Sequence, residues 1–231
     1  MCERYSITLS QQDLEARFQA EVSPAYKPRY NAAPTQLLPV ITAGSKGFSF
    51  FYWGLPPIFT KNKNISQKLI NTKAETIALK ASTKNLITQK RCIIPADGYF
   101  LWKALGKKTR VPYRFVVENE QTFAMAGIWD EYETMDGEQT YTFMLLTVPA
   151  NDQVAEFSDR MPAILSKDAE KIWLDPTASL EQLVAVLKPY PTHQMSAYPV
   201  SPKINELEND SASLLRKTPP ADQFGNYTLF G

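Results

Sequence analysis

The sequence predicts one compact α+β domain in which strands predominate. Short runs rich in β-branched and aromatic residues recur along the chain, and turn residues separate them, as is typical of a sheet protein. The 231 residues include 17 prolines, which favour irregular connections between such strands. The chain is long enough to bury a sizeable core, and no repeat, low-complexity tract or linker divides it.

Seven segments have the composition of strands, and three have the pattern of helices. Strands are expected over residues 36–43, 48–53, 90–94, 99–102, 111–117, 123–129 and 141–148. The turn dipeptide Asp136-Gly137 predicts that the last two of these strands form a hairpin. Helices are expected over residues 13–22, 167–174 and 180–187, and Ser10 followed by Asp13 marks the start of the first.

The composition argues against several classes of protein. No run approaches the ~18 apolar residues of a membrane helix, and the N-terminus lacks the pattern of a signal peptide. The two cysteines give no disulfide framework, so the reducing cytoplasm is the expected compartment, and Cys92 in its apolar run is expected in the core. The single histidine, His193, excludes a His-rich metal site. We therefore expect no metal, no other cofactor and no membrane association.

Charge is distributed unevenly along the chain. Residues 60–116 contain 13 Lys or Arg and two acidic residues, whereas residues 117–231 contain seven basic and 18 acidic residues. A basic segment inside a neutral protein is the pattern expected for a polyanion groove, although a solvated lysine-rich surface has the same composition. Aromatic residues at 48–53 and 99–102 could stack on unpaired bases beside that segment, or they could form strand core.

Cys2 is the residue that most directly suggests a reaction. Aminopeptidases remove Met1 when the next side chain is small, and this would leave an α-amine and a thiol on adjacent carbons. Both groups are partly in their nucleophilic forms near neutral pH. Such an aminothiol condenses with an aldehyde to give a five-membered thiazolidine, which is a form of covalent capture. The alternative is that Cys2 follows the start codon by chance.

Several short motifs contain residue types found in functional sites, although each alone is also typical of turns. In chain order they are Met1-Cys2-x-Arg4-Tyr5, Arg29-Tyr30-Asn31-x-Ala33-Pro34-Thr35, Trp53-Gly54-Leu55, Asn71-x-Lys73-x-Glu75-Thr76, Arg91-Cys92-x-x-Pro95-x-x-Gly98-Tyr99, Arg160-Met161-Pro162 and Pro199-Val200-Ser201. Together and in this order, they resemble the SRAP family, the abasic-site-processing proteins once described as SOS-response-associated peptidases. The resemblance extends from residue 2 to about residue 215.

The resemblance implies a fold, a partner and a chemistry. The fold would be a single α+β domain over residues 1–231, with a curved, barrel-like, mostly antiparallel sheet, a few flanking helices and a peripheral tail from about residue 217. The protein would be a monomer of the DNA damage response, cytoplasmic and associated with the nucleoid, that binds single-stranded DNA containing abasic sites. Such proteins capture the abasic-site aldehyde as a thiazolidine crosslink, and lyase and peptidase activities are implied with it.

The motif positions also imply roles for individual residues. Cys2 matches the nucleophile, Asn71 matches the asparagine that orients the opened sugar, and Asn31 matches an asparagine near the N-terminal cysteine. Six residues match positions expected to contact DNA, namely Arg4, Pro34, Trp53, Gly54, Lys73 and Arg160. Lys73 stands where the family has arginine, so it can meet a phosphate as a point charge but without a bidentate fork.

Two proton-transfer positions of the family pattern are substituted. Leu101 stands at the position of a catalytic glutamate, and Ser158 stands at that of a histidine. Since a placed acid or base typically contributes ~10²–10⁴-fold to a reaction, we expect a slow crosslinker. Glu3, which replaces a common glycine, and the carboxylates Glu75 and Asp159 are the nearby groups that could substitute for the missing ones.

Two other functions stay open at the level of the sequence. The protein could be a noncatalytic relative that binds single-stranded DNA and has lost crosslinking. It could also be a Cys-dependent peptidase or thiol hydrolase, which would need His193 as the base for Cys2. The substitutions leave open whether the protein is an enzyme.

Overall fold

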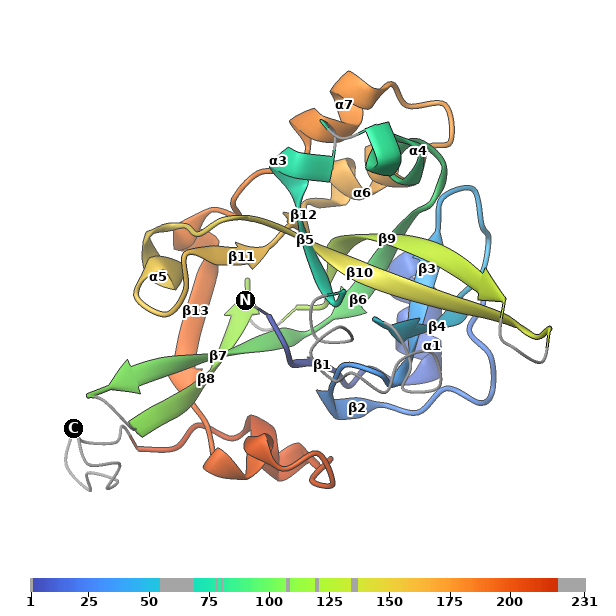
Figure 1. Ribbon diagram of the computed structural model, residues 1–231. Helices are drawn as coiled ribbons and strands as arrows, with labels where there is room; N and C mark the ends of the chain where they lie inside the picture. The colour runs from blue at the N-terminus through green and yellow to red at the C-terminus, as the bar shows by residue number, and fades with distance from the viewer. Residues whose placement is uncertain are drawn as a thin grey trace.

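The computed structural model describes residues 2–54, 69–77, 79, 81–106, 109–118, 121–133 and 137–219. It confirms the predicted α+β class, because two β-sheets form the body of the molecule and short helices lie around them (Figure 1). None of the helices within these ranges is long and apolar enough to cross a lipid bilayer.

Five strands close into a small barrel. They are β3 (Leu37–Thr42), β4 (Ser49–Trp53), β6 (Arg91–Ala96), β9 (Phe123–Glu133) and β10 (Gln139–Pro149). The order β10-β4-β3-β6-β9 is circular because β9 also pairs with β10. Within this ring only the β4–β10 pairing is parallel, so the expected curved, barrel-like and mostly antiparallel sheet is confirmed. Closure gives each strand of the ring a neighbour on both edges.

Three short strands extend the barrel. The strand β5 (Asn71–Lys73) pairs in parallel with β10 beyond β4, and β11 (Arg160–Pro162) pairs with the end of β10. The strand β12 (Ile164–Leu165) pairs with β9. β10 therefore contacts four strands, and its far end carries two segments, β5 and β11, that lie far apart in the sequence.

A second, five-stranded sheet continues from the barrel. Its order is β13 (Met195–Pro199), β8 (Thr109–Val117), β7 (Gly98–Leu105), β1 (Tyr5–Ile7) and β2 (Arg29–Ala32). The N-terminal strand β1 lies inside this sheet, between β2 and β7. The described residues that precede β1 therefore lead into an inner strand of the sheet and not into an edge strand.

Asp97 joins the two sheets at the point where β6 ends and β7 begins. Its carboxylate accepts hydrogen bonds from the Ser6 hydroxyl at 2.5 Å and from the Thr8 backbone N–H and hydroxyl at 2.5 and 2.7 Å. Arg114 of β8 donates to the same carboxylate at 2.9 Å, and both side chains of this ion pair are buried. The charge of Asp97 thus has several donors, and it holds β1 against β7 and β8.

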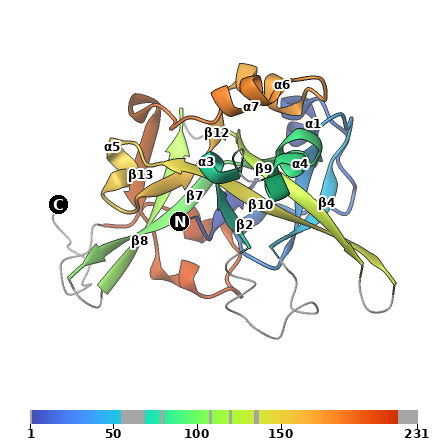
Figure 2. The same cartoon turned by 45° about the horizontal axis from the view of Figure 1, so that its top comes forward.

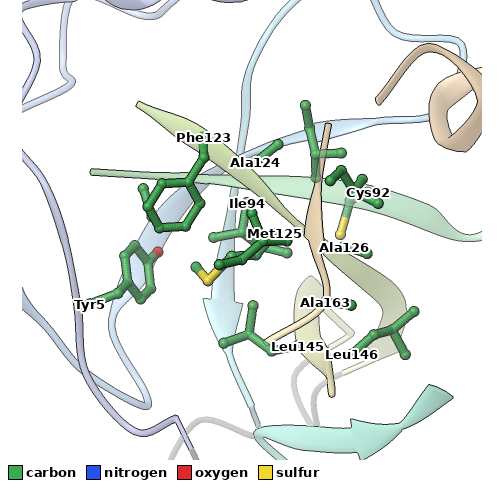
Figure 3. Packing of buried hydrophobic residues seen from close by; sticks show 14 of the residues in the cluster. Tyr5, Cys92, Ile94, Phe123, Ala124, Met125, Ala126, Leu145, Leu146 and Ala163 are labelled. Carbon is green, nitrogen blue, oxygen red and sulfur yellow. The ribbon is translucent and has the colours of Figure 1, made fainter. Parts of the chain in front are cut away.

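The core lies between the sheets and inside the barrel. Figure 3 shows part of one buried cluster that joins Tyr5 of β1 to Ile94 of β6 and Met125 of β9. Gly127 of β9 is required by this packing, because a Cβ atom there would lie 2.3 Å from Cδ1 of Ile94. The first strand and the barrel thus share one core.

The three predicted helices are present, but the bounds of two of them differ from the prediction. α1 (Gln11–Phe18) begins after Ser10, whose side chain accepts the N–H of Asp13, and it ends at Gln19 in the left-handed region. It is therefore earlier and shorter than the expected 13–22. α6 (Lys167–Leu174) has the expected bounds and α7 (Leu180–Ala185) ends two residues early. The structure adds α3 (Ala74–Ile77), α4 (Ala81–Gln89), α5 (Asp152–Ala155) and the 3₁₀ turns η1 (Thr192–Gln194), η2 (Pro202–Asn205) and η3 (Ala212–Leu215).

The seven predicted strands correspond to β3, β4 and β6–β10, and the predicted hairpin is the antiparallel pair β9–β10. Its turn residue Asp136 lies outside the described residues, as do most residues of the expected tail. The sequence pattern did not predict β1, β2, β5 and β11–β13, and residues 29–32, which belong to a motif typical of turns, form β2. These strands have five residues or fewer, which is too short for an alternating pattern to stand out.

Arg91 anchors two helices to the barrel through hydrogen bonds to their backbone carbonyl groups. Its guanidinium is fully buried and donates to the carbonyl oxygens of Ile87 at 3.0 Å, Trp173 at 2.8 Å and Asp175 at 2.7 Å, and also to that of Thr88. These carbonyls belong to α4 and to the end of α6. Figure 1 and Figure 2 accordingly show α4, α6 and α7 together over one end of the barrel.

Replacing this buried arginine should destabilise the fold strongly. We expect Arg91→Met to lower the free energy of unfolding by about 2–4 kcal/mol, because several buried carbonyl groups lose their donor. The matched control is Arg216→Met at an exposed arginine, for which we expect a change within about 0.5 kcal/mol. Urea unfolding followed by circular dichroism measures both, and equal effects would contradict the anchoring role.

Candidate active site at Cys2

Cys2 lies three residues before the first residue of β1, Tyr5, and is fully buried. Its thiol donates to the carbonyl oxygen of Arg4, with a sulfur–oxygen distance of 3.5 Å. Burial raises the pKa of the Cys2 thiol from 9.0 to about 12, because a thiolate would lose its hydration there. The thiol is therefore neutral at physiological pH, and any reaction at this sulfur needs a proton acceptor.

Asn71 holds the same residue from the barrel side. Its Nδ2 donates to the carbonyl oxygen of Cys2 at 2.7 Å, which connects β5 to the start of the chain. The preceding residue is itself positioned, since the indole of Trp53 donates to the carbonyl oxygen of Ile70 at 2.9 Å. The structure thus brings together Cys2 and Asn71, which are 69 residues apart in sequence.

A pocket of about 560 Å³ opens beside this terminus. Its lining residues come from the start of the chain, from β7 and β8, from the segment before β11, and from η2. They are Glu3, Arg4, Leu101, Trp102, Arg110, Phe157, Ser158 and Asn205. Both substituted positions, Leu101 and Ser158, therefore lie in the wall of the pocket next to Cys2.

Four of these lining residues were not assigned to the site from the sequence. Trp102 contributes an indole whose Nε1 donates to Oδ1 of Asn205 at 2.8 Å, Arg110 contributes a cation, and Phe157 packs edge-on against Phe115. Trp102 belongs to the aromatic run 99–102 and Arg110 to the basic segment 60–116, both of which were visible in the sequence, whereas no pattern pointed to Phe157. Asn205 gave no signal, because its place depends on the return of the C-terminal segment to β7.

Asn31 holds that C-terminal segment in place. Its Nδ2 donates to the carbonyl oxygens of Ile204, Glu206 and Asn209 at 3.2, 3.1 and 3.0 Å. The side chain of Asn31, which the family resemblance predicts to be catalytic, is therefore engaged with the η2 segment that carries Asn205. Within the described residues, its hydrogen bonds do not reach Cys2. Asn31 acts on the pocket through this segment.

Arg160 is used inside the protein. Its guanidinium makes a two-pronged ion pair with the Glu75 carboxylate at 2.8 and 2.9 Å, and it is largely buried. The hydrogen bonds from Arg160 lower the pKa of Glu75, so this carboxylate stays ionised. In this structure the side chain of Arg160 is thus engaged with Glu75, and its contact with DNA stays a prediction.

The other four expected DNA contacts differ in their exposure. Trp53 is fully buried and stacks on Phe143, with ring centroids 6.2 Å apart, so it offers no face to a base. Gly54 is also buried and has a φ of 77°. Pro34 is half-buried and Lys73 is exposed at the end of β5. Of these residues, Lys73 alone is freely exposed to a ligand.

Several cations of the basic segment 60–116 are engaged in ion pairs or hydrogen bonds inside the protein. Lys90 pairs with Asp130 at 2.7 Å, Lys103 with Glu156 at 2.8 Å, and the buried arginines Arg91 and Arg114 have the internal partners described above. Lys61, Lys63, Lys68, Lys80, Lys107 and Lys108 lie outside the described residues, as does the side chain of Lys84. The described surface therefore exposes fewer free cations than the net charge of this segment suggests.

The remaining candidates from the sequence are settled by burial. Cys92 is fully buried, as expected, and burial raises the pKa of its thiol. His193 is exposed on η1 whereas Cys2 is buried, so these two described side chains do not form a Cys–His pair. Over the described ranges, no group of three or more potential metal ligands occurs.

The fold and this terminal cysteine site define the class of protein. The chain belongs to the SRAP family, because a family model described as SOS response associated peptidase (SRAP) matches residues 1–207. The chain is 38% identical over 221 residues to the abasic site processing protein YoaM of Bacillus subtilis, covering 93% of this chain and 97% of that protein. It is 29% identical to the abasic site processing protein HMCES of Gallus gallus, over 82% of this chain and 66% of that protein.

Solved structures share the fold. A protein from Bacteroides thetaiotaomicron, 28% identical, superposes with a TM-score of 0.83 over 94% of this chain and 99% of that chain. A protein from Bordetella bronchiseptica, 26% identical, gives a TM-score of 0.74 over 87% of this chain and 100% of that chain.

The burial of Cys2 predicts slow alkylation in the folded protein. In a Cys92→Ala variant, Cys2 is the sole cysteine, and we expect iodoacetamide to modify it at least about tenfold more slowly than in urea. Adding Asn71→Ala should increase the native rate, because the Cys2 carbonyl then loses its bond to the barrel. Mass spectrometry gives both rates. A native rate equal to that in urea would contradict the buried placement.

The contacts of Asn31 predict a structural effect. We expect Asn31→Ala to lower the free energy of unfolding by about 2–4 kcal/mol, because three carbonyl groups lose a shared donor. The matched control is Asn85→Ala on the exposed side of α4, with an expected change within about 0.5 kcal/mol. If Asn31→Ala leaves stability unchanged in urea unfolding, the residue does not hold the C-terminal segment.

Proposed function

We propose that this protein binds single-stranded DNA and captures the aldehyde of an abasic site through Cys2. The observation that carries the proposal is the position of Cys2, held by Asn71 at the edge of the pocket lined by Glu3 and Arg4. Membership of the SRAP family and similarity to proteins named for abasic site processing support it. Met1, whose removal the chemistry requires, lies outside the described residues.

The reaction we propose needs no oxidant or cofactor. The α-amine of Cys2 attacks the aldehyde carbon, and loss of water gives an iminium ion. The thiol sulfur then attacks the same carbon and releases its proton. One C–N and one C–S bond form, the C=O bond is broken and one water leaves. Because the thiol is neutral in its buried position, the amine is the first nucleophile and the thiol completes the ring.

The pocket has the groups that a DNA strand without a base would need. Arg4 and Arg110 can meet phosphate oxygens, and exposed Lys73 can add a further charge from β5. The indole of Trp102 can stack on a neighbouring unpaired base, a contact worth roughly 1–3 kcal/mol. A duplex would keep its bases paired and stacked, and for this reason we propose a single-stranded partner.

The substitutions at positions 101 and 158 affect the rate of crosslinking that we propose. Leu101 contributes a hydrocarbon side chain to the pocket wall, and Ser158 contributes a hydroxyl with no acid–base function near neutral pH. We therefore propose that the crosslink forms more slowly than it would with a carboxylate and an imidazole at these two positions.

The proposal predicts a covalent adduct that depends on Cys2. The full-length protein is first checked by intact mass for removal of Met1, and it is then incubated with a single strand containing one abasic site. We expect a band that survives denaturing electrophoresis and a mass equal to protein plus strand minus water. Cys92→Ala should retain the band, and Cys2→Ala and Cys2→Ser should abolish it.

Two controls make this result specific. The same strand with an intact base, and the abasic strand reduced to an alcohol, should give no band. The proposal is overturned if wild-type protein lacking Met1 gives no adduct after long incubation, or if Cys2→Ala gives the same adduct.

One observation favours a second function, which is binding without chemistry. Cys2 is fully buried, and Leu101 and Ser158 occupy the two positions in the neighbouring pocket wall where the family pattern has proton-transfer groups. In that case the protein would bind undamaged and abasic strands equally, with an affinity that falls with salt and is unchanged by Cys2→Ala. Binding measured by fluorescence anisotropy in parallel with the gel distinguishes the two functions.

A further inference from the structure

We propose that Glu3 is the acid–base residue of the Cys2 site, giving a proton to the water that leaves and accepting one from the thiol. This assignment rests on the proposed chemistry of Cys2, and it goes beyond it by naming the group that transfers protons. Three observations support it: the composition of the pocket wall, the engagement of other carboxylates, and the electrostatic coupling of Glu3 to Cys2.

The composition of the wall leaves one candidate for proton transfer. Among the described residues that line the pocket, Glu3 provides the sole carboxyl group. The guanidinium groups of Arg4 and Arg110 can donate hydrogen bonds but have no acceptor atom, and a serine hydroxyl such as that of Ser158 is a weak acid and a weak base. The remaining lining side chains, Leu101, Trp102, Phe157 and Asn205, carry no group that titrates near neutral pH.

Two other carboxylates near the site are already engaged, and a third, Asp159, is exposed but is not one of the residues that line the pocket. Glu75 forms a bidentate ion pair with the Arg160 guanidinium, and this pair favours the ionised form of Glu75 and makes Glu75 a poor acid. Asp97 is buried with Arg114 and accepts further bonds from Ser6 and Thr8. Glu3, by contrast, is exposed at the pocket and has no ion pair within the described residues.

Glu3 is also coupled to the reacting group. It is bonded directly to Cys2, and the Arg4 guanidinium donates to the Glu3 carbonyl oxygen at 2.8 Å, which folds the side chain of Arg4 back along this segment. Burial is the largest cause of the raised pKa of the Cys2 thiol, and the charge of Glu3 adds to it. The carboxylate is therefore near enough to influence the ionisation of the thiol.

The carboxyl group of Glu3 accounts for both proton transfers of the reaction. The carboxylic acid form of Glu3 protonates the hydroxyl of the carbinolamine, which leaves as water when the iminium ion forms. The resulting carboxylate accepts the proton that the thiol releases as sulfur attacks the iminium carbon. Glu3 returns to its acid form, and the net change is the loss of one water.

The test measures single-turnover rates of crosslinking to an abasic single strand for four forms of the protein. They are the wild type, Glu3→Gln, Glu3→Asp and the double variant Glu3→Gln with Leu101→Glu. We expect Glu3→Gln to slow the reaction about 100-fold, Glu3→Asp to retain most of the rate, and the added Leu101→Glu to restore part of it. The rate–pH profile of the wild type should contain a carboxyl titration that Glu3→Gln removes.

Two further measurements separate this inference from the proposed function. Binding to an undamaged strand should be unchanged or tighter in Glu3→Gln, because a negative charge is removed. Glycolaldehyde replaces the strand in a second assay, in which the thiazolidine at residue 2 is followed by mass. If the strand gives no adduct but glycolaldehyde reacts with the same dependence on Glu3, the DNA function fails and the role of Glu3 stands.

Other outcomes overturn the role of Glu3. Equal or faster rates for Glu3→Gln with both aldehydes, at every pH, would show that the carboxylate is only a surface charge. A rate loss in Glu3→Asp equal to that in Glu3→Gln, without rescue by Leu101→Glu, would show a structural effect. Absence of reaction with both aldehydes in the wild type would overturn this inference and the proposed function together.

Discussion

The pairing of β10 with four other strands is the constraint on which the rest of the structure depends. β4 and β9 pair with its first half and close the barrel, and β5 and β11 pair with its second half. Because each neighbour takes its register from the same strand, β10 fixes their relative positions. β5 carries Asn71 and β11 follows Ser158, so the far end of one strand assembles two parts of the site around Cys2.

The candidate site combines a buried thiol with a polar pocket. Burial raises the pKa of the Cys2 thiol and keeps it neutral at physiological pH. The described lining of the pocket contains two arginines and one carboxylate. Under the proposed function, an abasic strand that enters this pocket would bring its phosphates to the arginines and its aldehyde carbon to the amine and the thiol of Cys2.

The ordered motifs predicted Cys2, Leu101 and Ser158 as site residues. The structure places Leu101 and Ser158 in the wall of the pocket that is also lined by Glu3 and Arg4, which directly follow the buried Cys2. Asn31 and Arg160 matched motifs equally well, but their side chains are engaged with distant groups of the same chain. These hydrogen-bond partners are 85 or more residues away in sequence and leave no local pattern, so a motif cannot distinguish a ligand contact from an internal one.

The sequence by itself determined the class of fold, the seven strands β3, β4 and β6–β10, the three capped or periodic helices and the choice of Cys2 as the candidate reactive residue, because each depends on neighbouring residues. The tertiary structure decided the closure of the barrel, the six short strands, the burial of Cys2 and Trp53, and the internal use of Lys90, Arg91 and Lys103. These features arise from contacts between segments distant in the chain. Their energies depend on burial and charge pairing, which exist only once the chain has folded.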